Sequence, residues 1–309
     1  MLLRSSWQLA QLFQAVLARV LTFLGAAPSP AVLAVASAAV LTPAPRLGPS
    51  GEKPRQNTPP RSPAPPVTLI HLHVPKSAGT SLRGALAANF GPGEKIAIRP
   101  ADFDATIDRM TAVQRAGLRM IFGHLPHGVG ARLDQPVIYL CVLRQPGPRL
   151  LSFYRYIRRQ ADHPLHRLLN ERDMSFGEYL TFCLDHPTMR LEVDNGQMRR
   201  LAGRLAQDSL GHEHDIFRLA LEHAFAPDMV LGLTERFTAF LDNLVAMGLI
   251  RSHSEARENA APETASFEEA RAALTPEQAA ILSRFTEWDQ KLYDICAIYL
   301  FGLDPQEGH

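Results

Sequence analysis

Cysteine, net charge and long apolar runs are all scarce in this chain of 309 residues, and each shortage excludes a class of protein. The cysteines Cys141, Cys183 and Cys296 are too few and too scattered for a disulfide framework, and no Cys/His cluster has zinc-site spacing. A net charge of +1 argues against a general nucleic-acid binder. The longest clean apolar run, residues 31–41, is too short to span a bilayer. We therefore expect no metal site and no nucleic-acid partner.

The first 66 residues differ in composition from the rest of the chain. Residues 1–42 are rich in Leu, Ala and Val, and residues 7–24 fit an amphipathic helix that contacts a membrane surface. A membrane anchor, a signal-like segment and a misassigned start codon fit the same pattern. Residues 43–66 hold nine prolines and predict a disordered, extended linker. We expect a cytoplasmic protein, with membrane association through the N-terminal segment as the alternative.

Beyond this linker, five apolar segments predict a parallel β-sheet. They are separated by helical patterns, which is the arrangement of an α/β domain. With 46% hydrophobic and 20% charged residues, the chain can bury one such core. The expected single domain covers residues 67–303 and is followed by a tail at 304–309. The five segments are residues 67–74, 96–99, 119–124, 137–144 and 229–235.

The first of these segments leads into a loop that is suited to bind an anion. The apolar strand 69–74 ends at Pro75, because proline cannot donate to a sheet ladder. Thr80 and Ser81 are natural N-cap residues for the helical run 82–89. A strand, a tight loop and a helix N-terminus together direct several N–H groups at one point, as phosphate binding requires.

The residues of this loop supply a positive charge and let the backbone come close to a ligand. Lys76 is one of only four lysines in the chain and supplies a positive charge. Ala78 and Gly79 let the backbone come close to a ligand. The loop is not a Walker A motif, because its lysine precedes its glycine. A strand-to-helix turn without a ligand is the alternative interpretation.

A second apolar strand, 137–144, ends in Arg144. Pro148 is well placed at the start of the next helix, which puts Ser152 one to two turns inside it. The guanidinium fork of Arg144 and the hydroxyl of Ser152 are therefore able to converge on one anion.

A histidine follows another predicted strand at the same edge of the sheet. Gly123 and His124 turn off the end of this strand, and ligands of α/β proteins bind beyond the carboxyl ends of strands. Histidine suits general-base catalysis, since its unperturbed pKa is about 6.5. His124 is the candidate base, with a structural strand-end histidine as the alternative and His127 as the next candidate. His71 and His73 lie inside the first strand and are expected to be packed.

The segment Val74–Leu82 resembles the 5′-phosphosulfate loop of the sulfotransferases that use 3′-phosphoadenosine 5′-phosphosulfate (PAPS) as donor. It is most similar to the carbohydrate branch, which includes the heparan sulfate 2-O-sulfotransferases and their bacterial relatives. Arg144 and Ser152 resemble the family's 3′-phosphate motif and have its eight-residue spacing, although Gln145 replaces the usual acidic residue. The resemblance implies that PAPS is bound by Lys76, Ser77, Ala78, Gly79, Thr80, Ser81, Arg144 and Ser152.

Two further segments extend the resemblance toward the reacting groups. His124 and its preceding glycine resemble the catalytic histidine of the glycan 2-O-sulfotransferases, with Phe122 where a second histidine often stands. Residues 194–203 resemble the family's Asn-x-Gln-x-Arg-x-Leu stretch, which implies a role in substrate binding. A polar helix start with Gly203 as C-cap fits these residues equally well. The implied substrate residues are Asn195, Gln197 and Arg199.

The resemblance implies a P-loop NTPase-like α/β fold, a parallel sheet flanked by helices, in which residues 229–237 supply the last strand and Thr234 caps the next helix. The expected enzyme is a PAPS-dependent sulfotransferase. In it, His124 removes the proton of a hydroxyl acceptor and Lys76 stabilises the departing phosphate, with no metal required. A glycan is the favoured acceptor, and a lipid or a small-molecule alcohol stays open. A nucleotide-dependent kinase and a non-catalytic nucleotide- or glycan-binding relative are the alternatives.

Overall fold

The computed structural model describes residues 67–205, 209–253 and 262–301. The predictions for the N-terminal segment and linker, residues 1–66, and for the tail 304–309 fall outside these ranges. None of the described helices is both long and apolar enough to cross a membrane.

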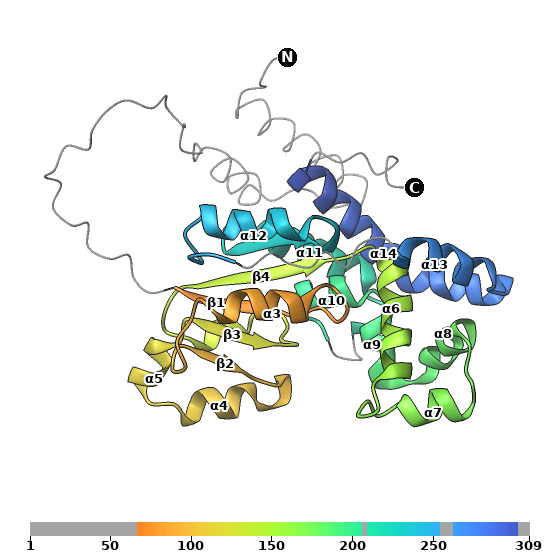
Figure 1. Ribbon diagram of the computed structural model, residues 1–309, viewed down its shortest axis with the longest axis horizontal. Coiled ribbons are helices and arrows are strands. Elements are labelled where there is room, and N and C mark those ends of the chain that lie inside the picture. The colour runs from red at the N-terminus through yellow and green to blue at the C-terminus, as the bar shows by residue number, and fades with distance from the viewer. Residues whose placement is uncertain (1–66, 206–208, 254–261, 302–309) are drawn as a thin grey trace, which may run out of the picture. The chain divides into compact units, whose positions relative to one another are not determined.

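A sheet of five parallel strands has the order β2-β3-β1-β4-β5 (Figure 1). β1 is central, because it pairs with β3 on one side and with β4 on the other. All five residues of β1 and the last five of β4 are buried, as their apolar sequences require. The predicted parallel α/β sheet is confirmed, and each predicted apolar segment overlaps one strand. The strands are β1 (Thr68–Leu72), β2 (Lys95–Ala97), β3 (Met120–Gly123), β4 (Val137–Leu143) and β5 (Met229–Leu233).

Helices make the crossovers that parallel strands need. The described helices are α3 (Gly79–Ala87), α4 (Phe103–Arg109), α5 (Ala112–Gly117), α6 (Pro146–Arg159), α7 (His166–Glu171), α8 (Phe176–Asp185), α9 (Pro187–Val193), α10 (Gly196–Ala202), α11 (Glu213–Ala224), α12 (Phe237–Ala246), α13 (Pro262–Ala272) and α14 (Pro276–Phe301). Short 3₁₀ turns occupy Pro100–Asp102, Val129–Arg132 and Thr234–Arg236.

Apolar clusters among the described residues hold these elements together. In the first, Leu82 of α3 and Phe240 of α12 pack with the sheet residue Leu140. The second lies among the helices and includes Ile157 of α6 and Phe285 of α14. Burying one such side chain stabilises the fold by about 1.5–3 kcal/mol.

Three predicted helix starts need correction. α3 begins at Gly79 after Ala78 in the left-handed conformation, so Thr80 and Ser81 lie inside its first turn and do not cap it. α6 begins with Pro146, two residues before the predicted Pro148. The hydroxyl of Thr234 donates to the carbonyl of Leu143 (3.1 Å) and caps no helix. In each case a backbone conformation or tertiary contact overrides the local capping preference.

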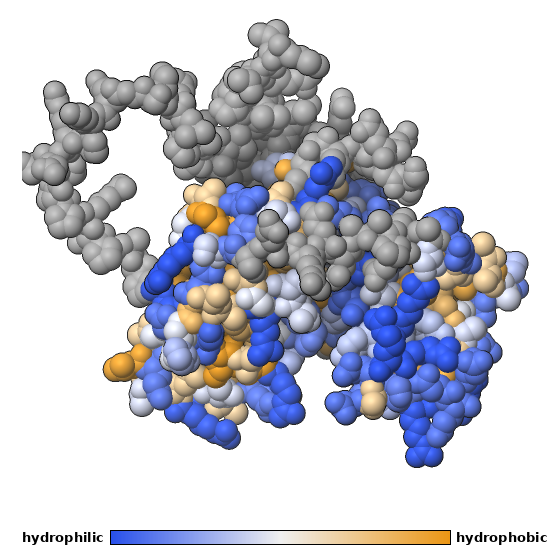
Figure 2. All heavy atoms as spheres, in the orientation of Figure 1, coloured by the Kyte–Doolittle hydropathy of each residue, from blue (hydrophilic) through white to orange (hydrophobic). Residues whose placement is uncertain are grey.

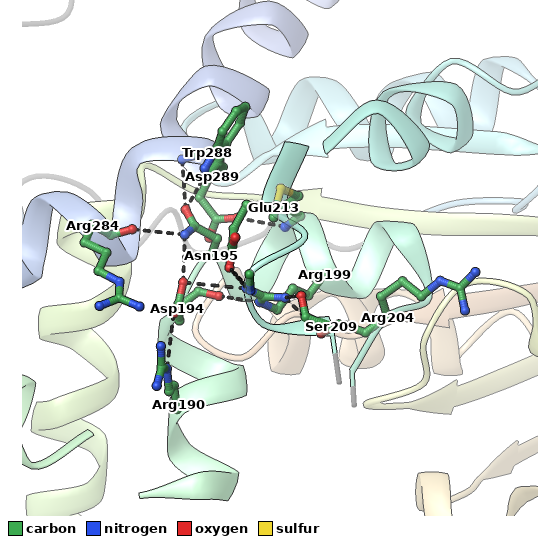
Figure 3. Close-up of polar contacts among 12 residues, drawn as sticks. Arg190, Asp194, Asn195, Arg199, Arg204, Ser209, Glu213, Arg284, Trp288 and Asp289 are labelled. Atoms are coloured by element: carbon green, nitrogen blue, oxygen red, sulfur yellow. Dashed lines mark hydrogen bonds and ion pairs between the residues drawn. The ribbon is translucent and has the colours of Figure 1, made fainter. Parts of the chain in front are cut away.

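α14 is bent where a side chain enters its hydrogen-bond ladder (Figure 3). Asn195 Nδ2 donates to the carbonyl of Arg284 (3.0 Å), and the backbone N–H of Asn195 donates to the carbonyl of Phe285 (2.8 Å). Asn195 Oδ1 accepts from the N–H groups of Trp288 (2.9 Å) and Asp289 (3.1 Å). A straight α-helix pairs these same carbonyls and N–H groups with each other. Insertion of a side chain into that ladder is a known cause of a kink.

Candidate active site

The carboxyl ends of the three central strands bring the predicted site residues to one edge of the sheet. The loop that contains Lys76 follows β1, His124 follows β3, and Arg144 follows β4. The strand order reverses at β1, since the chain moves first to one side of it and later to the other. Such a switch point is where open α/β sheets bind ligands. In Figure 1 this edge faces α6 and α10.

The loop after β1 has an unusual backbone. Lys76 (φ 67°) and Ala78 (φ 54°) are both left-handed, a conformation that costs a non-glycine residue about 1–3 kcal/mol. Left-handed residues in a turn direct neighbouring N–H groups toward one concave point, where an anion binds. The first-turn N–H groups of α3 have no acceptors within the helix and lie at the same place. The loop therefore has the donors that an anion needs.

Ser77 lies between these two left-handed residues and is 1% exposed. Its Oγ has no hydrogen-bond partner among the described residues. A buried hydroxyl without a partner costs about 1–3 kcal/mol. A ligand oxygen beside the loop would supply the missing partner, so Ser77 fits a phosphate or phosphosulfate group.

The side chains of Lys76 and Arg144 meet at this loop. Arg144 Nη1 donates to the carbonyl of Lys76 (3.0 Å), and Lys76 Nζ lies 4.5 Å from the ring centre of Tyr156. Tyr156 and Ser152 stand one turn apart on α6 and thus share a face of that helix. The loop, Arg144 and Tyr156 of α6 therefore lie together, and the convergence of Arg144 and Ser152 on one anion stays a prediction.

Two other elements hold the backbone where β4 ends. Gln197 Oε1 accepts from the N–H of Arg144 (3.0 Å), and Gln197 Nε2 donates to the carbonyl of Arg144 (2.8 Å). Glu235 Oε1 accepts from the N–H of Gln145 (3.2 Å). A carboxylate from the segment after β5 therefore lies beside Gln145. In the enzymes that this segment resembles, the residue at that position is itself usually acidic.

His124 has one ring nitrogen fixed by a hydrogen bond. His124 Nδ1 lies 3.0 Å from the carbonyl oxygen of His73. A carbonyl only accepts, so Nδ1 carries the proton and Nε2 of the neutral ring keeps its lone pair. Neighbouring atoms displace water from the ring and lower the pKa of His124, and the Arg200 guanidinium lowers it further. Glu192 and the bond to His73 oppose this without reversing it, so His124 is neutral at pH 7.

His71 and His73 are packed, as predicted, although β1 ends at Leu72 and His73 follows it. The His73 ring stacks on His124 at 4.2 Å and on His71 at 5.1 Å between ring centres. Burial, with a smaller effect of His124, lowers the pKa of His71 to about 3 and that of His73 to about 2. The ring of His73 also covers Gly79, where a Cβ would overlap it. The expectation that this glycine clears space for a ligand is therefore corrected, because the space is taken by His73.

His127, the second candidate base, contacts a different set of residues. Its ring stacks on His223 at 3.7 Å and lies 4.4 Å from Tyr139. Burial, followed by the effect of His223, lowers the pKa of His127 to about 4. Among the described residues, no group of three or more His, Cys, Asp or Glu is arranged to hold a metal ion.

The three implied substrate residues lie in the interior, at 0–1% exposure. Asn195 is bonded to α14, and Gln197 to the backbone of Arg144. Arg199 donates to the carbonyl of Asp194 (2.8 Å) and to Glu213 Oε1 (2.9 Å). Their geometry favours the other interpretation of this segment, a polar helix start, and Gly203 (φ 72°) is its C-cap.

Sequence reasoning did not identify Arg200, Glu192, Tyr156 or Glu235 as part of the site. Arg200 Nη2 donates to both carboxylate oxygens of Glu192 (2.8 and 3.1 Å), and both charges act on His124. No local pattern distinguishes them from the other charged residues of their helices, because the partners are far away in sequence.

An anion-binding loop beside a neutral histidine suits the transfer of a charged group to a nucleophile. Residues 64–219, about half of the chain, match the model of the Sulfotransferase family, so the chain belongs to the sulfotransferase family. This confirms the recognition of the family from its motifs. No curated protein matches the sequence.

Among solved structures, the chain is similar to mouse sulfotransferase SULT7A1, which was crystallised in complex with PAP. The two share 16% sequence identity with a TM-score of 0.40, over 76% of this chain and 86% of that chain.

Proposed function

We propose that this protein transfers a sulfuryl group from PAPS to a hydroxyl group of a glycan. The observation that carries the proposal is the hydrogen bond from Arg144 Nη1 to the carbonyl of Lys76 (3.0 Å). It joins the two segments that resemble the 5′- and 3′-phosphate motifs of PAPS-dependent enzymes. Membership of the sulfotransferase family supports the same reaction.

The described residues fit a donor with phosphate groups at both ends. The first-turn N–H groups of α3, Lys76 and the unpartnered hydroxyl of Ser77 would hold the 5′-phosphosulfate. Arg144 and Ser152 would hold the 3′-phosphate. When bound, PAPS supplies an electrophilic sulfuryl group on a phosphate leaving group.

His124 would act on the acceptor. Its Nε2 lone pair takes the proton of the acceptor hydroxyl as the new oxygen–sulfur bond forms and the sulfur–oxygen bond to phosphate breaks. Lys76 neutralises the charge that the departing phosphate oxygen gains. The resulting imidazolium is stabilised by its Nδ1–H bond to the carbonyl of His73.

A glycan is proposed as the acceptor because the loop and the Gly123-His124 pair resemble the carbohydrate branch of these enzymes. Figure 2 shows the face drawn there hollowed between α4 on one side and the helices α7 and α9 on the other, with mostly hydrophilic residues around the hollow. A polar rim of this kind suits the hydroxyl groups of a sugar chain.

The test is transfer of radiolabelled sulfur from PAPS to a panel of glycans, lipids and small alcohols. Label on a glycan that requires His124 supports the proposal, and label only on a lipid or small alcohol overturns the acceptor assignment. Phosphate transfer from ATP and magnesium without sulfur transfer would favour the kinase alternative. Nucleotide binding without any transfer would identify a non-catalytic relative.

A further inference from the structure

The helix α10 contacts both the segment that carries Arg144 and the segment that carries His124. All of its residues, Gly196–Ala202, are buried. Two of its side chains, Gln197 and Arg200, form hydrogen bonds with segments that carry proposed functional residues.

Gln197 acts on Arg144 as a neighbouring strand would. Its amide satisfies both the N–H and the carbonyl of Arg144, at 3.0 and 2.8 Å. The pairing of β4 with β5 ends one residue earlier, at Leu143 with Leu233. Gln197 thus continues the ladder by one residue and fixes the point from which the Arg144 guanidinium projects.

Arg200 acts on the segment of His124. Arg200 Nη1 donates to the carbonyl of His124, and Arg200 Nη2 bonds both carboxylate oxygens of Glu192 on α9. The carbonyl of Arg200 also accepts from the N–H of His127 (3.1 Å). The backbone on both sides of the turn after β3 is therefore attached to one residue of α10.

α10 itself is anchored from the opposite side (Figure 3). Asp289 of α14 accepts from the N–H groups of Gln197 (3.2 Å) and Met198 (2.7 Å), and so caps α10 in place of a local side chain. Arg199 points away from the site and bonds Ser209 and Glu213. These bonds hold α10 firmly against the core.

We propose that α10 is a positioning element which sets Arg144 through Gln197 and His124 through Arg200, so that donor and base are held in one frame. The roles of Arg144 and His124 rest on the proposed function, whereas the contacts themselves do not. In-line transfer needs such a frame, because errors of about 1 Å between reacting groups can cost about 10²-fold in rate.

The charged neighbours of His124 provide a direct test. Arg200 from α10 and Glu192 from α9 face it with opposite charges, and the other titratable groups beside it are His71 of β1 and His73, the residue after β1. In Arg200→Gln the NMR titration of the His124 ring should move up by about one pH unit, and in Glu192→Gln it should move down. Arg271→Gln is the control, because the Arg271 guanidinium bonds Glu268 (3.4 Å) on the exposed surface of α13. It should leave the titration unchanged.

Loss of stability alone does not shift a titration in opposite directions. An unchanged titration of His124 in Glu192→Gln, or an equal shift of it in Arg271→Gln, would overturn the Arg200 half of the inference. Glu192→Gln carries this test if Arg200→Gln does not fold. These measurements need no donor or acceptor, so they remain valid if the protein proves not to use PAPS.

The Gln197 half is tested by calorimetric binding of adenosine 3′,5′-bisphosphate. Gln197→Glu keeps the shape of the side chain but turns an oxygen toward the Arg144 carbonyl, and affinity should fall about tenfold. Gln135→Glu is the control, because Gln135 Nε2 also donates to a backbone carbonyl, that of Arg115 (2.7 Å), before β4 begins. Equal affinity in wild type and Gln197→Glu would overturn the inference. Wild-type protein that does not bind the nucleotide would instead refute the proposed function.

Discussion

The imidazole ring of His73 lies against the α-carbon of Gly79, so the residue after β1 packs on the first residue of α3. A methyl group at position 79 would overlap the ring and displace it from its stack with His124. We expect Gly79→Ala to lower the free energy of unfolding by about 1–3 kcal/mol and to reduce transfer. Chemical denaturation and a transfer assay measure the two effects.

Gly84 provides the control for this change, since it lies inside the same helix and a Cβ there would meet no atom within 4 Å. Gly84→Ala should stabilise the protein by about 0.5–1 kcal/mol. Equal effects at both glycines would show that the His73 contact has no energetic importance.

Arg144→Ala should weaken binding of adenosine 3′,5′-bisphosphate about 10- to 100-fold, because a charge-assisted contact worth about 1.5–3 kcal/mol is lost. In the wild type this nucleotide should raise the melting temperature far more than ADP, which lacks the 3′-phosphate. Arg159→Ala, at an exposed position on α6, should bind like the wild type. Equal stabilisation of the wild type by both nucleotides would contradict a 3′-phosphate site.

Ser77→Ala tests whether the hydroxyl of Ser77 binds a ligand or stabilises the fold. Because Ser77 Oγ has no partner among the described residues, its removal should not destabilise the free protein, yet nucleotide affinity should fall. Thr68→Val should behave in the opposite way, since Thr68 Oγ1 donates to the carbonyl of Leu118 (2.7 Å). We expect it to cost about 1–3 kcal/mol of stability and to leave affinity unchanged. Thermal unfolding and calorimetry distinguish the two patterns.

The pH dependence of transfer should have an acid limb below pH 6.5. His124 must be neutral to accept a proton, and burial and Arg200 place its pKa below the ordinary 6.5. Transfer is therefore lost as pH falls through that pKa and is level above it. His124→Ala should lower transfer about 10²- to 10⁴-fold, remove the limb and leave nucleotide affinity nearly unchanged. Near-normal turnover in this variant would eliminate His124 as the base.

His71 should contribute to stability in the same pH range. Burial lowers its folded-state pKa to about 3, so between 6.5 and about 3 the unfolded state binds one more proton than the folded state. This contribution is fully present above pH 6.5 and is lost as the pH falls, by about 1.4 kcal/mol per pH unit. Denaturation of wild type and His71→Leu across this range should show a shallower slope in the variant. Identical slopes would mean that His71 does not titrate on unfolding.

The strands, and the edge of the sheet at which the candidate site residues lie, were predictable from the sequence. Apolar runs such as Val137–Leu143 are long enough to be recognised as buried strands. The carboxyl ends of these strands determine where Lys76, His124 and Arg144 lie. The carboxyl ends of neighbouring parallel strands lie together whatever the details of packing, which is why the placement of these residues was predictable.

The supporting contacts were not predictable, because they depend on distance in space. Gln197 and Arg144 are 53 residues apart, and Arg200 and His124 are 76 apart. The same applies to α3, whose expected cap at Thr80 or Ser81 is replaced by a left-handed Ala78. Local propensity describes only what a segment prefers when nothing else contacts it.

The hydrogen bonds of Asn195 to the backbone of α14 have a consequence for the order in which the protein assembles during synthesis. Asn195 Oδ1 accepts hydrogen bonds from the N–H groups of Trp288 and Asp289, which follow Asn195 by 93 and 94 residues. A ribosome releases the sheet, Arg144, His124 and α10 well before it releases these partners. Until α14 emerges, the N-terminus of α10 lacks the Asp289 carboxylate that caps it. In a nascent chain, the hydrogen bonds that support the candidate site through α10 are therefore complete only after α14 has docked.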